Sequence, residues 1–342
     1  MTTHTASAGA TKRTRRSAGA PHGTKRSTSV VSGAGGPWAI GLAVAVPLAL
    51  LYVVLAPPAA DLAAATYRSN LFARSGFTAW DTGWYAAHGH WLPGYSLLSP
   101  ALGALLGVRT LLVCSAVAAS VLFALIATRA FGTRAARVSA AWFAFGVCVG
   151  MLSGRVPFDL GLAIGLGSVL ALMLGRLPVA LPLAVLTSVA SPVSGSFLAL
   201  AGLAGALGGV FVARGAPLAR ARREADAARA RESPEKESND TRSGTATRSG
   251  TATRSAAATR SGTALDRDVH RCLALTAAAL LPILALTLAY PEGGYEPFAA
   301  SAFWPPLAGV VLIALLLPQG PLGPRWRSAV RAGAALYALA LV

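Results

Sequence analysis

The sequence predicts an all-α protein: a polytopic transmembrane helical bundle of about nine spans. Hydrophobic residues make up 54% of the 342 residues and charged residues only 13%, and the mean hydropathy of +0.56 lies outside the range of ordinary soluble domains. Apolar stretches recur at close to the roughly 20 residues that a helix needs to cross a bilayer. Lys and Arg also gather on alternate sides of these stretches, as membrane topology requires.

Nine apolar stretches account for the predicted spans. In chain order they are residues 38–56, 108–128, 138–153, 158–175, 177–191, 195–213, 271–290, 304–318 and 329–342. A cleaved signal peptide is the alternative for the first stretch, but its length and the 36-residue polar leader before it favour a retained span. Residues 95–107 are apolar, too short to cross and contain Pro100, so we expect a re-entrant or interfacial helix there.

The positive charges predict the orientation of the chain. If the N-terminus is cytoplasmic, 26 of the 30 Lys and Arg fall on the inner side and only Arg68, Arg74, Arg109 and Arg155 on the outer side. One missed or invented span would invert everything after it and destroy this bias. We therefore predict a multi-pass protein integral to the cell membrane, with its N-terminus in the cytoplasm.

The charge distribution also divides the chain. We expect a disordered basic cytoplasmic tail at 1–36, a first membrane helical group at 37–213 with an outer loop at 57–107, a disordered basic cytoplasmic loop at 214–269, and a second membrane helical group at 270–342 that ends within an apolar run, as a truncated chain would. The loop carries TRSGTA repeats from Thr241, whose small polar residues cannot form a core. A short charged helix is expected at 217–232.

The composition predicts membrane lipids as partners and gives no support for a specific nucleic acid, a disulfide framework or a zinc site. Membrane lipids are the expected surroundings of the spans, and anionic lipid is one alternative for the basic loop, whose repeats otherwise form a solvated segment. No motif indicates binding of a specific nucleic acid. Cys114, Cys148 and Cys272 lie in separate apolar runs without CxxC spacing, so neither a disulfide framework nor a zinc site is predicted.

The outer loop has a composition unlike the rest of the chain. It concentrates aromatic and polar side chains: Trp80, Asp81, Trp84, Tyr85, His88, His90, Trp91 and Tyr95. An aromatic belt at the headgroups accounts for the Trp and Tyr residues, but not for Asp81, whose carboxylate between two Trp needs water or a cation. Asp81 is therefore a candidate base. Binding of a divalent metal by Asp81, His88 and His90 is the less favoured alternative, so we predict no metal site and leave the cofactor open.

Part of this loop resembles a known family. Trp80, Asp81 and Tyr85, followed by Pro93, Gly94, Tyr95, Leu97 and Leu98, resemble the W-D-x-x-x-[FY] and P-G-Y-x-L-L pattern of PIG-V-type mannosyltransferases, which belong to the GT-C superfamily of polytopic glycosyltransferases. The resemblance covers only this loop.

The resemblance implies a lipid-linked chemistry on the outer face. It implies a polyprenyl-phosphate sugar donor, possible transfer of mannose, and Asp81 as the base that deprotonates the acceptor hydroxyl. Arg155 is the best-placed cation for the lipid phosphate, although Arg155 and Asp159 are four residues apart and pairing between them is an alternative. The remaining candidate substrate-binding residues are Trp84, Tyr85, His88, His90 and Tyr95.

Two other classes of function stay open. A membrane transporter or lipid flippase would carry ionisable groups or broken helices near the bilayer centre, and the predicted spans contain few such groups. A non-catalytic integral membrane protein fits the same spans without any site. The sequence favours the glycosyltransferase hypothesis over both.

Overall fold

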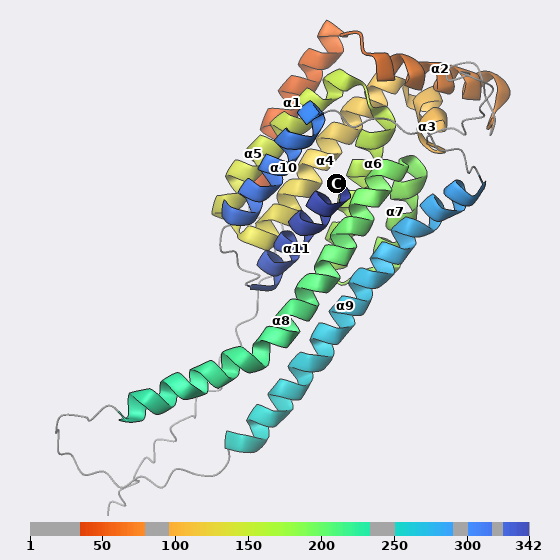
Figure 1. The fold of residues 1–342 in the computed structure, drawn as a ribbon. Coiled ribbons are helices and arrows are strands. Elements are labelled where there is room, and N and C mark those ends of the chain that lie inside the picture. Colours follow the sequence, from red (N-terminus) through yellow and green to blue (C-terminus); the bar gives the residue numbers. More distant parts are fainter. Residues whose placement is uncertain (1–34, 79–95, 233–249, 290–299, 317–323, 342) are drawn as a thin grey trace, which may run out of the picture. The chain divides into compact units, whose positions relative to one another are not determined.

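The computed structural model describes residues 35–78, 96–232, 250–289, 300–316 and 324–341 (Figure 1). These residues form helices and turns and contain no strand, which confirms the all-α prediction for this part of the chain. The helices are α1 Pro37–Leu55, α2 Ala60–Ser75, α3 Ser99–Leu106, α4 Val108–Phe131, α5 Thr133–Gly150, α6 Val156–Met173, α7 Leu177–Ala190, α8 Pro192–Glu232, α9 Gly250–Ala289, α10 Ala300–Leu316 and α11 Pro324–Leu341, with a 3₁₀ turn Met151–Ser153 between α5 and α6.

Six helical segments in the described residues are long and apolar enough to cross a membrane. They are α1, α4, α5 with its 3₁₀ turn, α6, residues Pro192–Phe211 of α8 and residues Asp266–Leu288 of α9. The apolar helix α7 has only 14 residues, α10 has 17, and α11 carries Arg325, Arg327 and Arg331. Each predicted span thus falls on a helix, while the count of nine spans stays a prediction.

Proline and glycine account for several helix boundaries. Pro37, Pro100 and Pro157 each stand in the first turn of a helix, where the missing N–H has no intrahelical acceptor to lose. Between α4 and α5, Gly132 has φ 82°, which lets the chain leave one helix and begin the next without a connecting loop. Local sequence therefore explains why consecutive helices in this part of the chain turn back on one another.

Small residues let the helices of the first membrane group approach closely. Ala45, Ala49, Ala116 and Ala144 are buried where α1, α4 and α5 meet, and small side chains favour such contacts between membrane helices. Large apolar side chains point outward instead: Val54 of α1 is 80% exposed and Trp142 of α5 is 76% exposed. Exposed apolar surface of this kind matches lipid as the surrounding solvent.

Helix α2 is a difference from the sequence analysis, which assigned residues 57–107 to a loop apart from its short helix. The structure has 16 helical residues there, because Leu62, Ala64 and Ser69 are buried against neighbouring elements. Asp61 lies in the first turn of α2 and Arg74 in the last, so both charges suit the helix dipole. The predicted short helix before the second span is present as α3, which packs against α2.

Helices α8 and α9 lie side by side along part of their lengths (Figure 1). Thr276 of α9 donates a hydrogen bond to the carbonyl of Ala199 in α8 (3.2 Å). Helix α8 includes residues 214–232, among them the short charged helix predicted at 217–232. Helix α9 includes residues 250–269, which the sequence analysis predicts to be disordered. Ala and Arg are strong helix formers, and a helix that packing has already nucleated extends at little cost. Residues 233–249 lie outside the described part.

Candidate functional site

A groove of about 520 Å³ lies where α2, the start of α6 and the start of α8 meet. Its charged lining residues are Asp61 and Arg68 of α2 and Arg155, which immediately precedes α6. Ser96, three residues before α3, and Ser99, the first residue of α3, complete the polar part of the lining. The groove therefore gathers charges from segments separated by about ninety residues in the sequence.

Regular helix geometry positions the α2 side of the groove. Asp61, Ala64, Ala65 and Arg68 all line it, and their i, i+3, i+4, i+7 spacing puts them on one face of a helix. The other face of the groove comes from Arg155, because the 3₁₀ turn and Gly154 end α5 and Pro157 starts α6 directly after it. Helix α2 and the turn that begins α6 thus each bring one arginine to the lining of the groove.

Arg155 is paired with Asp61 rather than with Asp159. Its Nε donates to Asp61 Oδ2 at 3.1 Å, and within the described residues no ion pair joins Arg155 to Asp159. The side chains of Arg155 and Asp61 are 68% and 48% exposed, so water screens the pair and its contribution to stability is about 0–1 kcal/mol. Another anion can therefore replace Asp61 at low energetic cost.

The rest of the groove is apolar. Phe158 of α6 and Phe197 of α8 contribute to its wall, with ring centroids 6.3 Å apart in an edge-to-face arrangement. Ser194 donates a hydrogen bond to the carbonyl of Phe158 (3.0 Å), which ties the start of α8 to α6. An apolar wall beneath a rim with two arginines suits a molecule that has an apolar chain and an anionic head.

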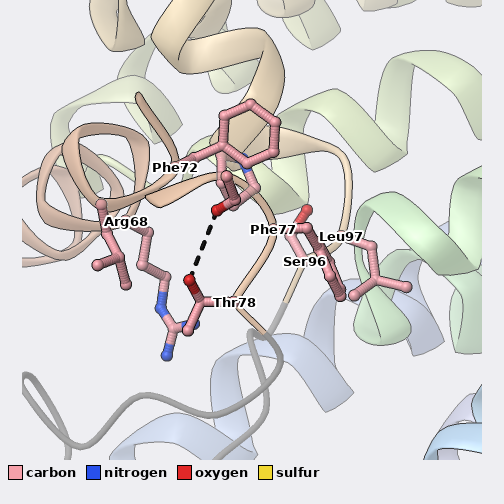
Figure 2. Close-up of a pocket in the computed structure, with 9 residues that line it drawn as sticks. Arg68, Phe72, Phe77, Thr78, Ser96 and Leu97 are labelled. Atoms are coloured by element: carbon pink, nitrogen blue, oxygen red, sulfur yellow. Dashed lines mark hydrogen bonds between the residues drawn. The ribbon is translucent and has the colours of Figure 1, made fainter. Parts of the chain in front are cut away.

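A smaller cavity of about 30 Å³ lies at the end of α2 and shares Arg68 and Ser96 with the groove. Figure 2 shows this cavity with Arg68, Phe72, Phe77, Thr78, Ser96 and Leu97 among the residues that line it. Thr78 donates to the carbonyl of Gly76 (3.5 Å), and the N–H of Leu97 donates to the carbonyl of Val189 in α7 (3.0 Å). The last described residues before and after the aromatic segment 79–95 therefore both line one cavity beside the groove.

Most of the predicted site residues lie outside the described part of the chain. These are Asp81, Trp84, Tyr85, His88, His90 and Tyr95, so their roles stay predictions, as does the alternative metal site. Among the described residues, no three His, Cys, Asp or Glu side chains gather as metal ligands. Of the predicted substrate contacts, only Arg155 is placed, and it lines the groove.

The sequence analysis did not identify Asp61 and Arg68 as site residues. Their signal was the seven-residue spacing of two charges around Ala64 and Ala65, which has meaning only on a helix. The sequence analysis predicts a loop over residues 57–107 apart from one short helix, and in a loop this spacing does not define a face. A helix prediction for residues 60–75 would have placed both charges on one face.

Comparison with known proteins gives no relative from which the role of the site could be inferred. No protein-family model, no curated protein and no solved structure matches the chain.

Proposed function

We propose that this chain is an integral membrane glycosyltransferase that moves a sugar, with mannose as the first candidate, from a polyprenyl-phosphate donor to an acceptor on the outer face. The observation that carries the proposal is the groove, in which Arg68 and Arg155 stand at the rim of an apolar wall. A polyprenyl phosphate has the matching parts, an apolar chain and a phosphate.

Each part of the groove has a role in this proposal. The polyprenyl chain lies against the wall that includes Phe158 and Phe197, while the phosphate binds Arg155 and Arg68, whose guanidinium groups match its oxygens. In the described arrangement, Arg155 donates a hydrogen bond to Asp61, and both residues line the groove. The donor phosphate then replaces Asp61, which is exposed and weakly held.

The proposed base is Asp81, which removes the proton from the acceptor hydroxyl as that oxygen attacks the anomeric carbon. The lipid phosphate leaves with the bonding electrons, through an oxocarbenium-like transition state and with inversion at carbon. Support comes from the sequence, in which Asp81 follows Thr78 by three residues. Thr78 lines the small cavity that adjoins the groove at Arg68.

The test is transfer by the purified chain in lipid vesicles. Radiolabelled mannose on polyprenyl phosphate, and then other sugars on the same carrier, are supplied with candidate hydroxyl acceptors. We expect labelled acceptor to accumulate with at least one sugar. Absence of transfer with every donor, together with absence of donor binding to the groove, would refute the enzyme and favour a transporter, a flippase or a non-catalytic protein.

Replacing Arg155 should weaken donor binding specifically. We expect Arg155→Gln to raise KM for the donor about tenfold, since a hydrogen bond to a charged group contributes roughly 1.5 kcal/mol or more, and Arg155→Lys to restore part of the loss. Initial rates over a range of donor concentrations measure both effects. The matched control is Arg74→Gln, which removes an exposed cation of α2 that lines neither cavity. Equal changes in both variants would contradict a specific phosphate contact.

We also propose that the groove opens on the outer face and that the N-terminus is cytoplasmic. Support comes from three predicted outer cations that gather at one end of the bundle: Arg68 and Arg155 line the groove, and Arg109 donates to the carbonyl of Ala56, at the end of α1 and just before α2 (3.1 Å). The predicted outer cations thus share one end of the bundle, and they are few, as the positive-inside rule expects of an outer face.

Cysteine labelling of intact cells measures this orientation. In a background with Cys114 and Cys272 replaced by Ala, Ser75→Cys at the end of α2 should react with a membrane-impermeant maleimide. Thr133→Cys, exposed at the start of α5, should react only after the membrane is permeabilised. The reverse pattern would invert the proposed topology.

A further inference from the structure

Asp159 is a buried acid that the proposed transfer does not use. It lies in the first turn of α6, one turn beyond Arg155, and is only 5% exposed. Its Oδ2 has no hydrogen-bond partner among the described residues. An ionised carboxylate in such surroundings requires a cation or several donors, so its protonation and its pairing must be considered together.

The neighbours of Asp159 do little to balance the negative charge that an ionised Asp159 carboxylate would carry. Tyr52 of α1 and Cys148 of α5 lie within electrostatic range of the Asp159 carboxyl and are 4% and 5% exposed. The Tyr52 hydroxyl has no hydrogen-bond partner among the described residues, and the Cys148 thiol donates to the carbonyl of Ala45 (3.7 Å). Both groups are uncharged, so neither balances a carboxylate.

The charged groups on the surrounding elements are few. Arg155 precedes α6 and acts on Asp159, Arg109 of α4 acts on Tyr52, and Asp61 and Arg68 belong to α2. Helices α1, α3 and α7 and the described side chains of α8 near α6 carry no charge. Arg109 donates through Nη2 to the carbonyl of Ala56, and its buried Nη1 has no hydrogen-bond partner among the described residues. Arg155, which directly precedes α6, is the cation that acts on Asp159 itself.

We propose that Asp159 is a buried proton-binding site, and that its proton determines whether Arg155 pairs with Asp61 or with Asp159. The arrangement described here corresponds to the protonated site: Asp159 has no charge to pair, and Arg155 reaches Asp61 across the groove. When the proton leaves to bulk water, the carboxylate draws Arg155 back, since Asp159 lies in the first turn of α6 and Arg155 directly precedes that helix. The link between α2 and α6 is then released.

The exchange would alter the groove whatever ligand it binds. Arg155 and Asp61 both line it, so withdrawal of Arg155 removes one of its cations from the rim and frees Asp61. This inference does not depend on sugar transfer, because it concerns only the protonation of Asp159 and the partner of Arg155.

Infrared difference spectroscopy of the full chain in lipid vesicles tests the proposal, because the C=O stretch of a carboxylic acid is separate from the bands of carboxylates. We expect wild-type protein to show an acid band that disappears as the pH rises and that is absent in Asp159→Asn. The matched control, Asp226→Asn, removes an exposed carboxyl of α8 and should leave this band unchanged. A band that survives in Asp159→Asn would overturn the proton site.

Two variants that leave the buried site intact test the exchange itself. Arg155→Gln removes the partner of the ionised form, so the band should persist to a pH about one unit higher or more. Asp61→Asn removes the competitor for Arg155, so the band should disappear at a lower pH than in wild type. Both variants change exposed side chains and decide the proposal even if Asp159→Asn does not fold. Unchanged midpoints, or midpoints displaced in the same direction, would refute the exchange.

Discussion

Asp81→Asn is expected to lower sugar transfer by about 10²- to 10⁴-fold, the usual contribution of a general base. Asn preserves the shape of the side chain but cannot accept the acceptor's proton at neutral pH. Initial rates at saturating donor and acceptor measure the loss in kcat. Because the lipid phosphate is bound elsewhere in the proposed site, KM for the donor should change little.

The matched control for Asp81→Asn is Asp61→Asn. It makes the same chemical change in an acid that lines the groove but contacts Arg155 instead of the acceptor. We expect Asp61→Asn to retain transfer, since the proposed base is unchanged. Equal transfer by wild type and Asp81→Asn would exclude Asp81 as the base.

Gly154→Ala is expected to have the largest effect on stability. Gly154 has φ 73°, a conformation that costs an L-residue about 1–2 kcal/mol. A Cβ there would also lie 2.6 Å from the backbone nitrogen of Leu62, and relieving such a contact in a packed core typically costs a further 1–3 kcal/mol or so. Because Leu62 follows Asp61, the substitution should also displace the partner of Arg155.

Gly175→Ala separates the two contributions. Gly175 has φ 74°, but a Cβ at that position meets no atom within 4 Å. Thermal unfolding in detergent micelles should therefore show a small loss of stability for Gly175→Ala and a clearly larger one for Gly154→Ala. If both variants lose the same stability, α2 does not pack on Gly154 as described.

The groove illustrates which parts of a membrane protein can be predicted from one sequence. Long apolar runs identify membrane helices reliably, because the bilayer requires about 20 apolar residues with internally satisfied backbone groups. Helix α2 has no such run and contains Asp61, Arg68 and Arg74. Its helical structure is supported by burial of Leu62 and Ala64 against other elements, contacts that do not appear in its local pattern.

The ion-pair partner of Arg155 is a second feature that could not be predicted from the local sequence. The four-residue spacing in the sequence suggested Asp159 as the partner of Arg155, whereas the structure pairs Arg155 with Asp61, 94 residues away. Asp159 instead faces the buried side of α6, and Arg155 lies at the exposed start of that helix. Which acid meets Arg155 thus depends on how α2 lies across the beginning of α6.

The sequence by itself determined that the described chain is helical and apolar enough for a membrane, because hydropathy and helix boundaries are properties of neighbouring residues. Only the tertiary structure decided that Asp61, Arg68 and Arg155 share one groove and that Asp159 is buried without a hydrogen-bond partner for Oδ2 among the described residues. Those relations depend on contacts between helices distant in sequence, since burial and pairing are set by packing rather than by local composition.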